Sequence, residues 1–266
     1  MNKAIFGNYL PGNSNIHRMN PTAKILATLL VITWILFANN IWNYGLLVAF
    51  AVFETYLAQL KLKTVLKAIK PFIWLIMFTV VIQIIFSPHG SSYFSWGPIK
   101  ITNYGIQLAG LIFIRFVLII IQATLLTMTT SPNSIASGVE KLIAPLRYVG
   151  VPVETIGIMI SIALRFVPTL MEELQVIMDA QRSRGVMFNS GGFIKRCKNI
   201  ISLIIPILVS SFRHADNLAD ALGASGYEAN QPRSSYRQYH WNLTDSITII
   251  AVILLGIAVI LMRTLS

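Results

Sequence analysis

The chain has 266 residues, of which 55% are hydrophobic and only 12% are charged, and its formal net charge is +11. Soluble globular domains carry about 25% charged residues, so this composition excludes an ordinary soluble domain and indicates a multi-pass membrane protein. A basic chain can also bind nucleic acid, but no soluble basic face is visible, and we expect no nucleic-acid partner.

Five apolar stretches approach the roughly 20 residues that a membrane-spanning helix needs. They are 25–38, 44–60, 71–86, 104–128 and 246–262. Two further apolar stretches, 156–164 and 200–212, are shorter: Arg165 ends the first and Pro206 interrupts the second. We therefore assign these two to core or interfacial helices. No cleavable signal peptide is expected, because the first apolar run begins only after Lys24.

Charge placement favours five spans with a cytosolic N-terminus. In that arrangement all but Lys100, Arg115 and Arg263 of the 21 Lys and Arg residues fall on the cytosolic side, as the positive-inside rule requires. The expected fold class is an all-α integral membrane protein with about five transmembrane helices and a cytosolic or interfacial domain of three helices. The expected division is a membrane domain at 1–130, a cytosolic domain at 131–240 and a last span at 241–266.

Polar residues also mark the membrane part. Glu54 and Arg115 are the ionised side chains well inside the predicted spans, at similar depth, and such residues usually face a partner. We expect an ion pair between them; a proton relay would need further acids or histidines. The lysines between 61 and 70 act either as topology determinants or as binders of anionic lipid, and the sequence leaves both readings open.

The segment 131–240 is cytosolic by charge yet rich in apolar residues. Turn signals divide it into three predicted helices, at 131–150, 152–184 and 192–224. Ser131 is suited to the N-cap of the first helix and Pro132 to its first position. Pro168 and Pro206 lie inside the second and third helices and are expected to kink them.

The last two of these helices end alike, in "DAQRSRG" (179–185) and "DALGASG" (220–226). Two ordinary helix ends are one reading, because glycine is a common C-cap. A docking surface is the other, because small residues allow close approach and Arg184 offers a guanidinium to a carboxylate. The candidate docking residues are Asp179, Arg182, Ser183, Arg184 and Gly185 in the first end, and Asp220, Ala224, Ser225 and Gly226 in the second.

Four motifs carry a resemblance to a known family. They are "GNYLPGNSNIHRMNPTAKI" (7–25), "LLTMTTSPNSIASGVEKLIAPL" (125–146), "ALRFVPTLMEELQVIMDAQRSRG" (163–185) and "RHADNLADALGASGY" (213–227). With them, nearly the whole chain resembles the transmembrane T component of energy-coupling factor (ECF) transporters, the EcfT family. The third motif ends in a sequence similar to the family's Ala-Arg-Gly signature, here Ser183-Arg184-Gly185. The fourth has Ser225 where the family usually has arginine.

This resemblance implies a scaffold and coupling subunit in the cell membrane of a prokaryote. Its partners would be the lipid bilayer, two cytosolic ABC-type ATPases and one or more vitamin-binding S components. It implies that Arg184 docks one ATPase and the Ala224–Gly226 end docks the other. The apolar halves of the helices, at 156–167 and 200–212, would face the S component.

The residues themselves support a subunit without catalytic machinery. The sequence has no Gly-x-x-x-x-Gly-Lys-(Ser/Thr) loop for ATP. No metal or cofactor is expected, because Cys197 is the single cysteine and the four histidines, at 17, 89, 214 and 240, lack ligand spacing. The alternatives are the T component of a dedicated cobalt or nickel importer and, in a different class, a self-contained secondary carrier. A membrane-embedded enzyme is a third class, but the chain shows no catalytic set.

Overall fold

The computed structural model describes residues 9–86, 92–96, 99–188, 190, 192–227 and 240–265. The expected turn at 188–192 lies partly outside these ranges, as do Gly7, Asn8 and His89. The chain forms two compact units. Unit 1 comprises Met1–Leu142 and Arg237–Ser266, and unit 2 comprises Ile143–Tyr236.

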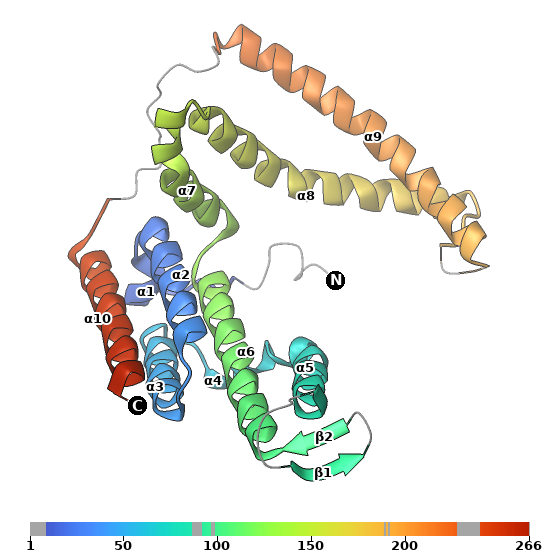
Figure 1. Cartoon of the computed structure of the whole chain (residues 1–266). Coiled ribbons are helices and arrows are strands. Elements are labelled where there is room, and N and C mark those ends of the chain that lie inside the picture. The colour runs from blue at the N-terminus through green and yellow to red at the C-terminus, as the bar shows by residue number, and fades with distance from the viewer. Residues whose placement is uncertain are drawn as a thin grey trace. The chain divides into compact units, whose positions relative to one another are not determined.

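Helices dominate both units (Figure 1). The elements of unit 1 are α1 (Asn15–Arg18), α2 (Pro21–Phe37), α3 (Ile41–Leu57), α4 (Leu62–Lys67), η1 (Lys70–Phe72), α5 (Ile73–Phe86), β1 (Ser92–Trp96), β2 (Ile99–Thr102), α6 (Asn103–Thr129), α7 (Pro132–Ile143) and α10 (Leu243–Leu265). Those of unit 2 are η2 (Ala144–Val149), α8 (Val153–Ser183) and α9 (Phe193–Ala224). The all-α membrane fold class is confirmed, with one short antiparallel hairpin of β1 and β2 that the sequence analysis did not foresee.

Local sequence explains where the main helices begin. Asn20 caps α2 by accepting a hydrogen bond from the Thr22 amide, and Pro21 takes the first helical position, where its missing N–H costs nothing. Thr102 caps α6 in the same way through the amide of Gly105. The predicted cap at Ser131 is also present, since its hydroxyl accepts from the Ser134 amide at the start of α7.

The core of unit 1 lies among α2, α3, α6 and α10. Its buried side chains come from all four helices: Ala27, Val31, Ile35, Ala38, Tyr44, Leu47, Ala51, Leu118, Val252, Leu255 and Val259. Close approach of α2 and α10 depends on Gly256. A Cβ atom at that position would lie 2.1 Å from Cε2 of Trp34, so the indole occupies the space that a side chain would need.

Length and composition single out four described helices as able to cross a membrane. They are Leu62–Phe86, which joins α4, η1 and α5, then Asn103–Thr129, Thr155–Ser183 and Leu243–Thr264. The predicted spans at 25–38 and 44–60 form α2 and α3, which have 17 residues each and so reach only about 25 Å. They fall short of a typical 30 Å hydrocarbon layer by about one turn.

The sequence-based assignment kept the region 155–183 out of the bilayer, but the length and composition of this helix would allow it to span one. The reason is that α8 continues without a break through Pro168, so its apolar first half is extended by an amphipathic second half. Its mean hydropathy is 1.4, against 2.2–2.6 for the other three candidates. The location of α8 outside the bilayer therefore stays a prediction, as do the kinks at Pro168 and Pro206, which both lie within continuous helices.

We expect Gly256→Ala to destabilise unit 1 by about 1–3 kcal/mol, because an added Cβ forces Trp34 or α10 to move. Gly110→Ala is the matched control, since a Cβ at that helical glycine meets nothing within 4 Å. Thermal unfolding of the purified protein in detergent, followed by tryptophan fluorescence, measures both. Equal melting temperatures for the two variants would contradict the packing described for Trp34.

Candidate functional site

The C-terminal ends of α8 and α9 adopt the same backbone turn. Gly185 has φ +83° and Gly226 has φ +70°, the left-handed conformation that glycine adopts without strain. At the α8 end, the Gly185 amide donates to the carbonyl of Arg182, and the Val186 amide donates to that of Gln181. This pair of bonds defines a Schellman motif.

The α9 end repeats these bonds residue for residue. The amide of Gly226 donates to the carbonyl of Gly223, and the amide of Tyr227 donates to that of Leu222. The likeness of "DAQRSRG" and "DALGASG" therefore encodes one shared helix-ending turn. The same motif also ends α3, where Gln59 takes the left-handed conformation at φ +56°. The turn by itself is thus an ordinary helix end, and any special role must come from the side chains.

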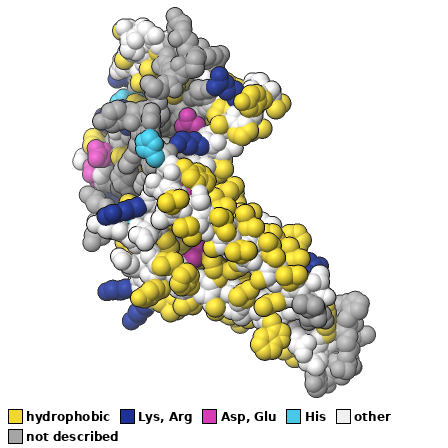
Figure 2. Space-filling model, turned by 90° about the vertical axis from the view of Figure 1, so that its left-hand side faces the viewer, with side chains coloured by type: hydrophobic (Ala, Val, Ile, Leu, Met, Phe, Trp, Pro, Cys, Tyr) yellow, Lys and Arg dark blue, Asp and Glu magenta, His cyan; other side chains and the backbone are white. Residues whose placement is uncertain are grey.

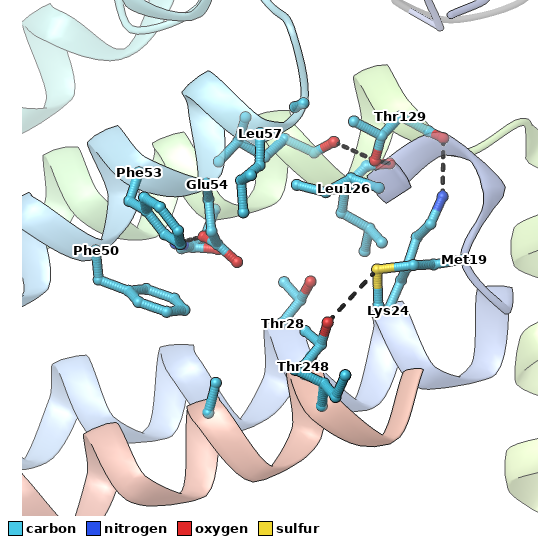
Figure 3. Close-up of a pocket in the computed structure, with 17 residues that line it drawn as sticks. Met19, Lys24, Thr28, Phe50, Phe53, Glu54, Leu57, Leu126, Thr129 and Thr248 are labelled. Carbon is cyan, nitrogen blue, oxygen red and sulfur yellow. Dashed lines mark hydrogen bonds between the residues drawn. The ribbon is translucent and has the colours of Figure 1, made fainter. Parts of the chain in front are cut away.

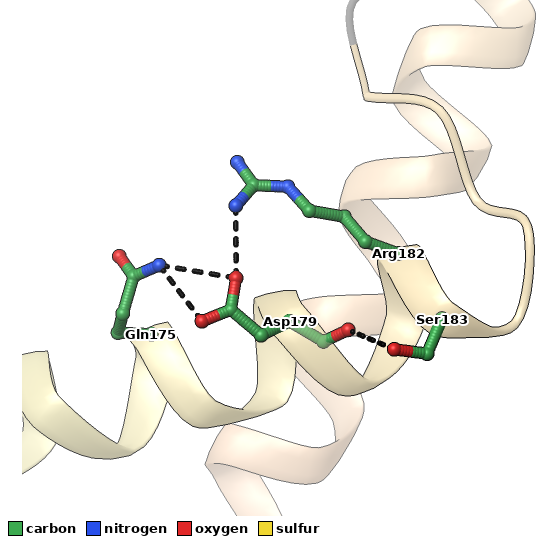
Figure 4. Close-up of polar contacts among 4 residues, drawn as sticks. All are labelled: Gln175, Asp179, Arg182 and Ser183. Carbon is green, nitrogen blue, oxygen red and sulfur yellow. Dashed lines mark hydrogen bonds and ion pairs between the residues drawn. The ribbon is translucent and has the colours of Figure 1, made fainter.

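Four side chains at the α8 end bond to one another or to their own helix (Figure 4). Arg182 donates to Asp179 at 2.9 Å, and Gln175 donates to the same carboxylate. Ser183 donates its hydroxyl proton to the backbone carbonyl of Asp179. By contrast, no hydrogen bond or ion pair joins the exposed side chain of Arg184 to another described residue.

The α9 end is small and lacks a matching cation. Asp220, Ala224, Ser225 and Gly226 are all exposed. Ser225 donates its hydroxyl proton to the carbonyl of Leu222, so its side chain folds back on its own helix. The two ends therefore present the same backbone shape with different charge.

The two ends lie far apart because α8 and α9 run antiparallel. Glu173 holds the pair together near its middle: it accepts from the hydroxyl of Ser210 and lies 3.4 Å from Nε2 of His214. Where the helices meet in sequence, Asn199 donates to the carbonyl of Met187. From Asn199 to Gly226 the helical rise of 1.5 Å per residue amounts to roughly 40 Å.

Large apolar surfaces remain uncovered. On α9 the exposed apolar residues are Ile194, Ile200, Ile201, Ile204, Ile205, Leu208, Val209 and Phe212, and on α8 they include Met159, Val167, Met171 and Val176. Unit 1 also exposes apolar surface: Figure 2, viewed from the side on which α10 lies in Figure 1, shows hydrophobic side chains over a broad area with Lys and Arg side chains at its edges. Apolar surface of this extent indicates contact with lipid or with other proteins.

The structure corrects one expected site, the ion pair between Glu54 and Arg115. The two side chains, both described, do not pair with each other. Glu54 accepts from Nε2 of Gln122 at 2.6 Å, whereas Arg115 donates to the Tyr44 hydroxyl and to the carbonyl of Ala38. The physical reason is a difference in register. The 27-residue α6 extends beyond the first turn of α3, so Arg115 is level with the start of α3 and Gln122 with Glu54.

Besides the contact of Glu54 with Gln122, unit 1 contains a second polar site, which is formed by the buried Lys24. It lies at the same end of unit 1 as Glu54. Lys24 is 5% exposed, and its ammonium donates to the carbonyls of His17 and Thr129 and to the hydroxyl of Thr130, at 3.1–3.3 Å. All three of its protons therefore have acceptors. Figure 3 shows this contact at the edge of a pocket of about 280 Å³, into which Glu54 also points.

Asp245 completes this cluster from the other end of the chain. Its carboxylate is fully buried and accepts from the backbone amides of Asn20 and Asn242, at 3.0 and 2.8 Å. Burial lowers the pKa of the nearby His17, which favours a neutral ring that donates from Nε2 to the carbonyl of Leu10 and accepts at Nδ1 from Ser14. The polar cluster, defined as His17, Asn20, Lys24 and Asp245, thus joins the starts of α2 and α10 to the end of α6.

Sequence reasoning missed the role of this cluster. Lys24 was counted only as a cytosolic charge, and Asp245 was not singled out. The available signal was the motif at 7–25, whose His17, Asn20 and Lys24 are the residues that make these contacts. Likewise, Glu173 and His214 gave no recognisable pattern, because their contact depends on the crossing of α8 and α9.

Comparisons with known proteins agree on one family. Residues 12–236 match the family model described as cobalt transport protein. The chain is 47% identical over 257 residues to the energy-coupling factor transporter transmembrane protein EcfT of Streptococcus equi, covering 97% of this chain and 96% of that protein. It is 42% identical to a Listeria monocytogenes protein named EcfT 1, covering 98% of both chains. It is 40% identical to the EcfT protein of Lactococcus lactis over the whole of both chains.

We expect Gly185→Ala to loosen the α8 end, because a non-glycine residue in the left-handed conformation costs roughly 1–2 kcal/mol. Hydrogen exchange should accelerate several-fold at the amides of Gly185 and Val186. Gly192→Ala is the control, since Gly192 has φ −64° and open space around its Cβ position. If hydrogen exchange at the α8 end were unchanged, the left-handed conformation of Gly185 would not be what holds this turn together.

We expect Lys24→Met to lower the free energy of unfolding by about 1–3 kcal/mol, because it removes the donor from three acceptors, one in α1 and two at the end of α6. Lys63→Met makes the same chemical change at an exposed position and should have little effect. Thermal unfolding compares the two variants. Equal stability would mean that the polar cluster does not hold unit 1 together.

Proposed function

The chain belongs to the family of energy-coupling factor transporter transmembrane proteins, and from this premise we propose how it couples its partners. As a T component it is a non-catalytic membrane subunit of an ECF transporter. We propose that it joins two cytosolic ABC-type ATPases to a substrate-binding S component. In this role the α8 end and the α9 end each seat in one ATPase, and the helices transmit movement of the ATPases to the S component.

The observation that carries this proposal is that the two ends share one backbone turn, differ in side-chain charge and lie at opposite ends of one antiparallel helix pair. A separation of roughly 40 Å gives each end room for its own protein. Glu173 ties α8 to α9 near their middle, so a displacement of one end is passed to the other helix. The apolar faces of α8 and α9, which nothing covers in the described part of the chain, offer the surface for the S component.

The two seats differ in charge. At the α8 end Arg184 is the exposed cation whose side chain has no described partner, so it is the residue that offers a carboxylate two parallel hydrogen bonds. At the α9 end Ser225 bonds to its own helix, so we propose that this seat works by shape alone. Asp179 and Arg182 neutralise each other and support the α8 end rather than contact a partner.

The orientation that serves this role places the N-terminus and unit 2 in the cytosol of a prokaryotic cell. The distribution of Lys and Arg supports it, because almost all of them then lie on the cytosolic side. The lower hydropathy of α8 supports its position outside the bilayer. The domain division proposed from the sequence, with a coupling domain at 131–240, follows from the same orientation.

The transported substrate has two candidates within this family. We propose vitamin uptake, in line with the resemblance of the motifs. A dedicated cobalt or nickel importer is the second candidate, favoured by the description of the matching family model as cobalt transport protein. Uptake assays with radiolabelled vitamins and with Co²⁺, in vesicles that contain the complete complex, separate the two. A self-contained secondary carrier does not agree with the family assignment.

We expect Arg184→Ala to weaken retention of one ATPase at least tenfold and to reduce ATP-driven uptake, because truncating one partner of a buried charge pair costs roughly 2–5 kcal/mol. Arg213→Ala is the matched control, because Arg213 is an equally exposed arginine in the middle of α9. Co-purification of both ATPases and uptake in reconstituted vesicles provide the two readouts. Normal assembly and normal uptake by Arg184→Ala would refute the docking role.

Ser225→Arg adds to the α9 end the kind of charge that Arg184→Ala removes from the α8 end. We expect this variant to retain both ATPases and to keep or improve uptake, because the exposed position has space for a longer side chain. Arg184→Ser, which converts the first end to the charge state of the second, should impair coupling. Loss of uptake in Ser225→Arg with full activity in Arg184→Ser would reverse the proposed division between the two ends.

A further inference from the structure

A groove beside α4 combines basic and apolar surfaces. It consists of two adjoining hollows of about 790 and 270 Å³, which share Leu10 and Thr64. We call it the α4 groove and define it by Lys61, Thr64, Lys67, Phe72, Ile120 and Ala123, which line one hollow or the other. All of these residues belong to unit 1.

The polar side of the α4 groove is one face of a short amphipathic segment. Lys61, Thr64 and Lys67 follow one another at intervals of three residues, which places them on the same side of a helix. Val65, in the same segment, is fully buried and fixes α4 against the bundle. Lys63 and Lys70, from the same stretch, do not line either hollow.

These lysines have no acidic counterpart nearby. The sequence contains no Asp or Glu between Glu54 and Glu140. Among the described residues, no hydrogen bond or ion pair engages the side chain of Lys61, Lys63, Lys67 or Lys70. The groove therefore carries positive charge that the protein itself leaves uncompensated, and an anion is the complementary ligand.

The other side of the groove is apolar and lies at the start of a membrane-spanning helix. Phe72 comes directly before α5, and Ile120 and Ala123 lie on α6. A ligand with an anionic head and a hydrocarbon tail matches both sides at once. In the orientation proposed above, α4 lies at the cytosolic surface of the bilayer, where anionic phospholipids are found.

We propose that the α4 groove is a binding site for one anionic phospholipid of the inner leaflet. Its phosphate binds Lys61 and Lys67, with the Thr64 hydroxyl between them, and one acyl chain lies along Phe72, Ile120 and Ala123. This resolves the two readings of the lysines at 61–70: Lys61 and Lys67 hold the lipid, whereas Lys63 and Lys70 act through general attraction to the membrane. The proposal rests on the orientation and on the complex proposed above.

The test uses the complete complex, purified from nanodiscs of phosphatidylcholine with increasing fractions of phosphatidylglycerol. Native mass spectrometry counts the phosphatidylglycerol molecules retained by each complex. A lysine at a membrane surface contributes about fivefold in affinity, so Lys61→Gln with Lys67→Gln should weaken retention roughly 30-fold. The control is Lys63→Gln with Lys70→Gln, which removes the same charge outside the groove and should weaken retention far less.

Two further measurements separate the lipid from other ligands. Ala123→Trp fills the apolar side, keeps every lysine and should also abolish retention. Inorganic phosphate at 10 mM should not displace the lipid, because it lacks a tail. The proposal is overturned by equal loss in both double variants, by full displacement with phosphate, or by loss of an ATPase from Lys61→Gln/Lys67→Gln with lipid retention unchanged. Because assembly is read in the same spectra, intact complexes without bound lipid would refute this site and leave the proposed function standing.

Discussion

Buried charge needs hydrogen-bond partners in an apolar bundle, and this requirement organises unit 1 around its N-terminal segment. Lys24 saturates acceptors at the end of α6, while the Asn20 amide binds Asp245 at the start of α10. The chain leaves unit 1 after α7, which follows α6 directly, and returns before α10. The end of α6 and the start of α10 are therefore held by the same few residues. Asn20 and Lys24 thus hold together segments that are more than 100 residues apart in the chain.

Unit 2 repeats one backbone motif with different side chains around it. The Schellman turn fixes the direction in which each helix stops, and its recurrence at Gln59 shows that the turn alone carries no specificity. Specificity comes from the side chains around it. At the α8 end Arg182 is already paired with Asp179, which leaves Arg184 as the available guanidinium, whereas the α9 end offers small exposed residues. The two ends thus share a backbone shape and differ in charge, which agrees with the two different ATPase contacts proposed above.

Features that depend on neighbouring residues could be predicted from the sequence. Helical periodicity and turn residues placed α8 and α9 within about one residue of their observed ends, and Ser131 was found as a cap. Features that depend on distant residues could not. Glu54 and Arg115 were matched by depth on the assumption that α3 and α6 begin at the same level, but α6 reaches further and Gln122 takes the place of Arg115. The burial of Lys24 is hidden for the same reason, because two of its three acceptors lie more than 100 residues away.

The contact between Asn20 and Asp245 spans 225 positions in the chain. At 5–20 residues per second, a ribosome needs roughly 10–45 s to synthesise the intervening segment. Once α6 has been made, α2, α3 and α6 can assemble, while the amide of Asn20 still has no carboxylate and Trp34 has no Gly256 to pack against. The nascent protein thus passes through an open form of unit 1 that only the arrival of α10 closes. A chain truncated before α10 would remain in that form, with the start of α2 unsatisfied and a strip of its core exposed to lipid or to quality-control proteases.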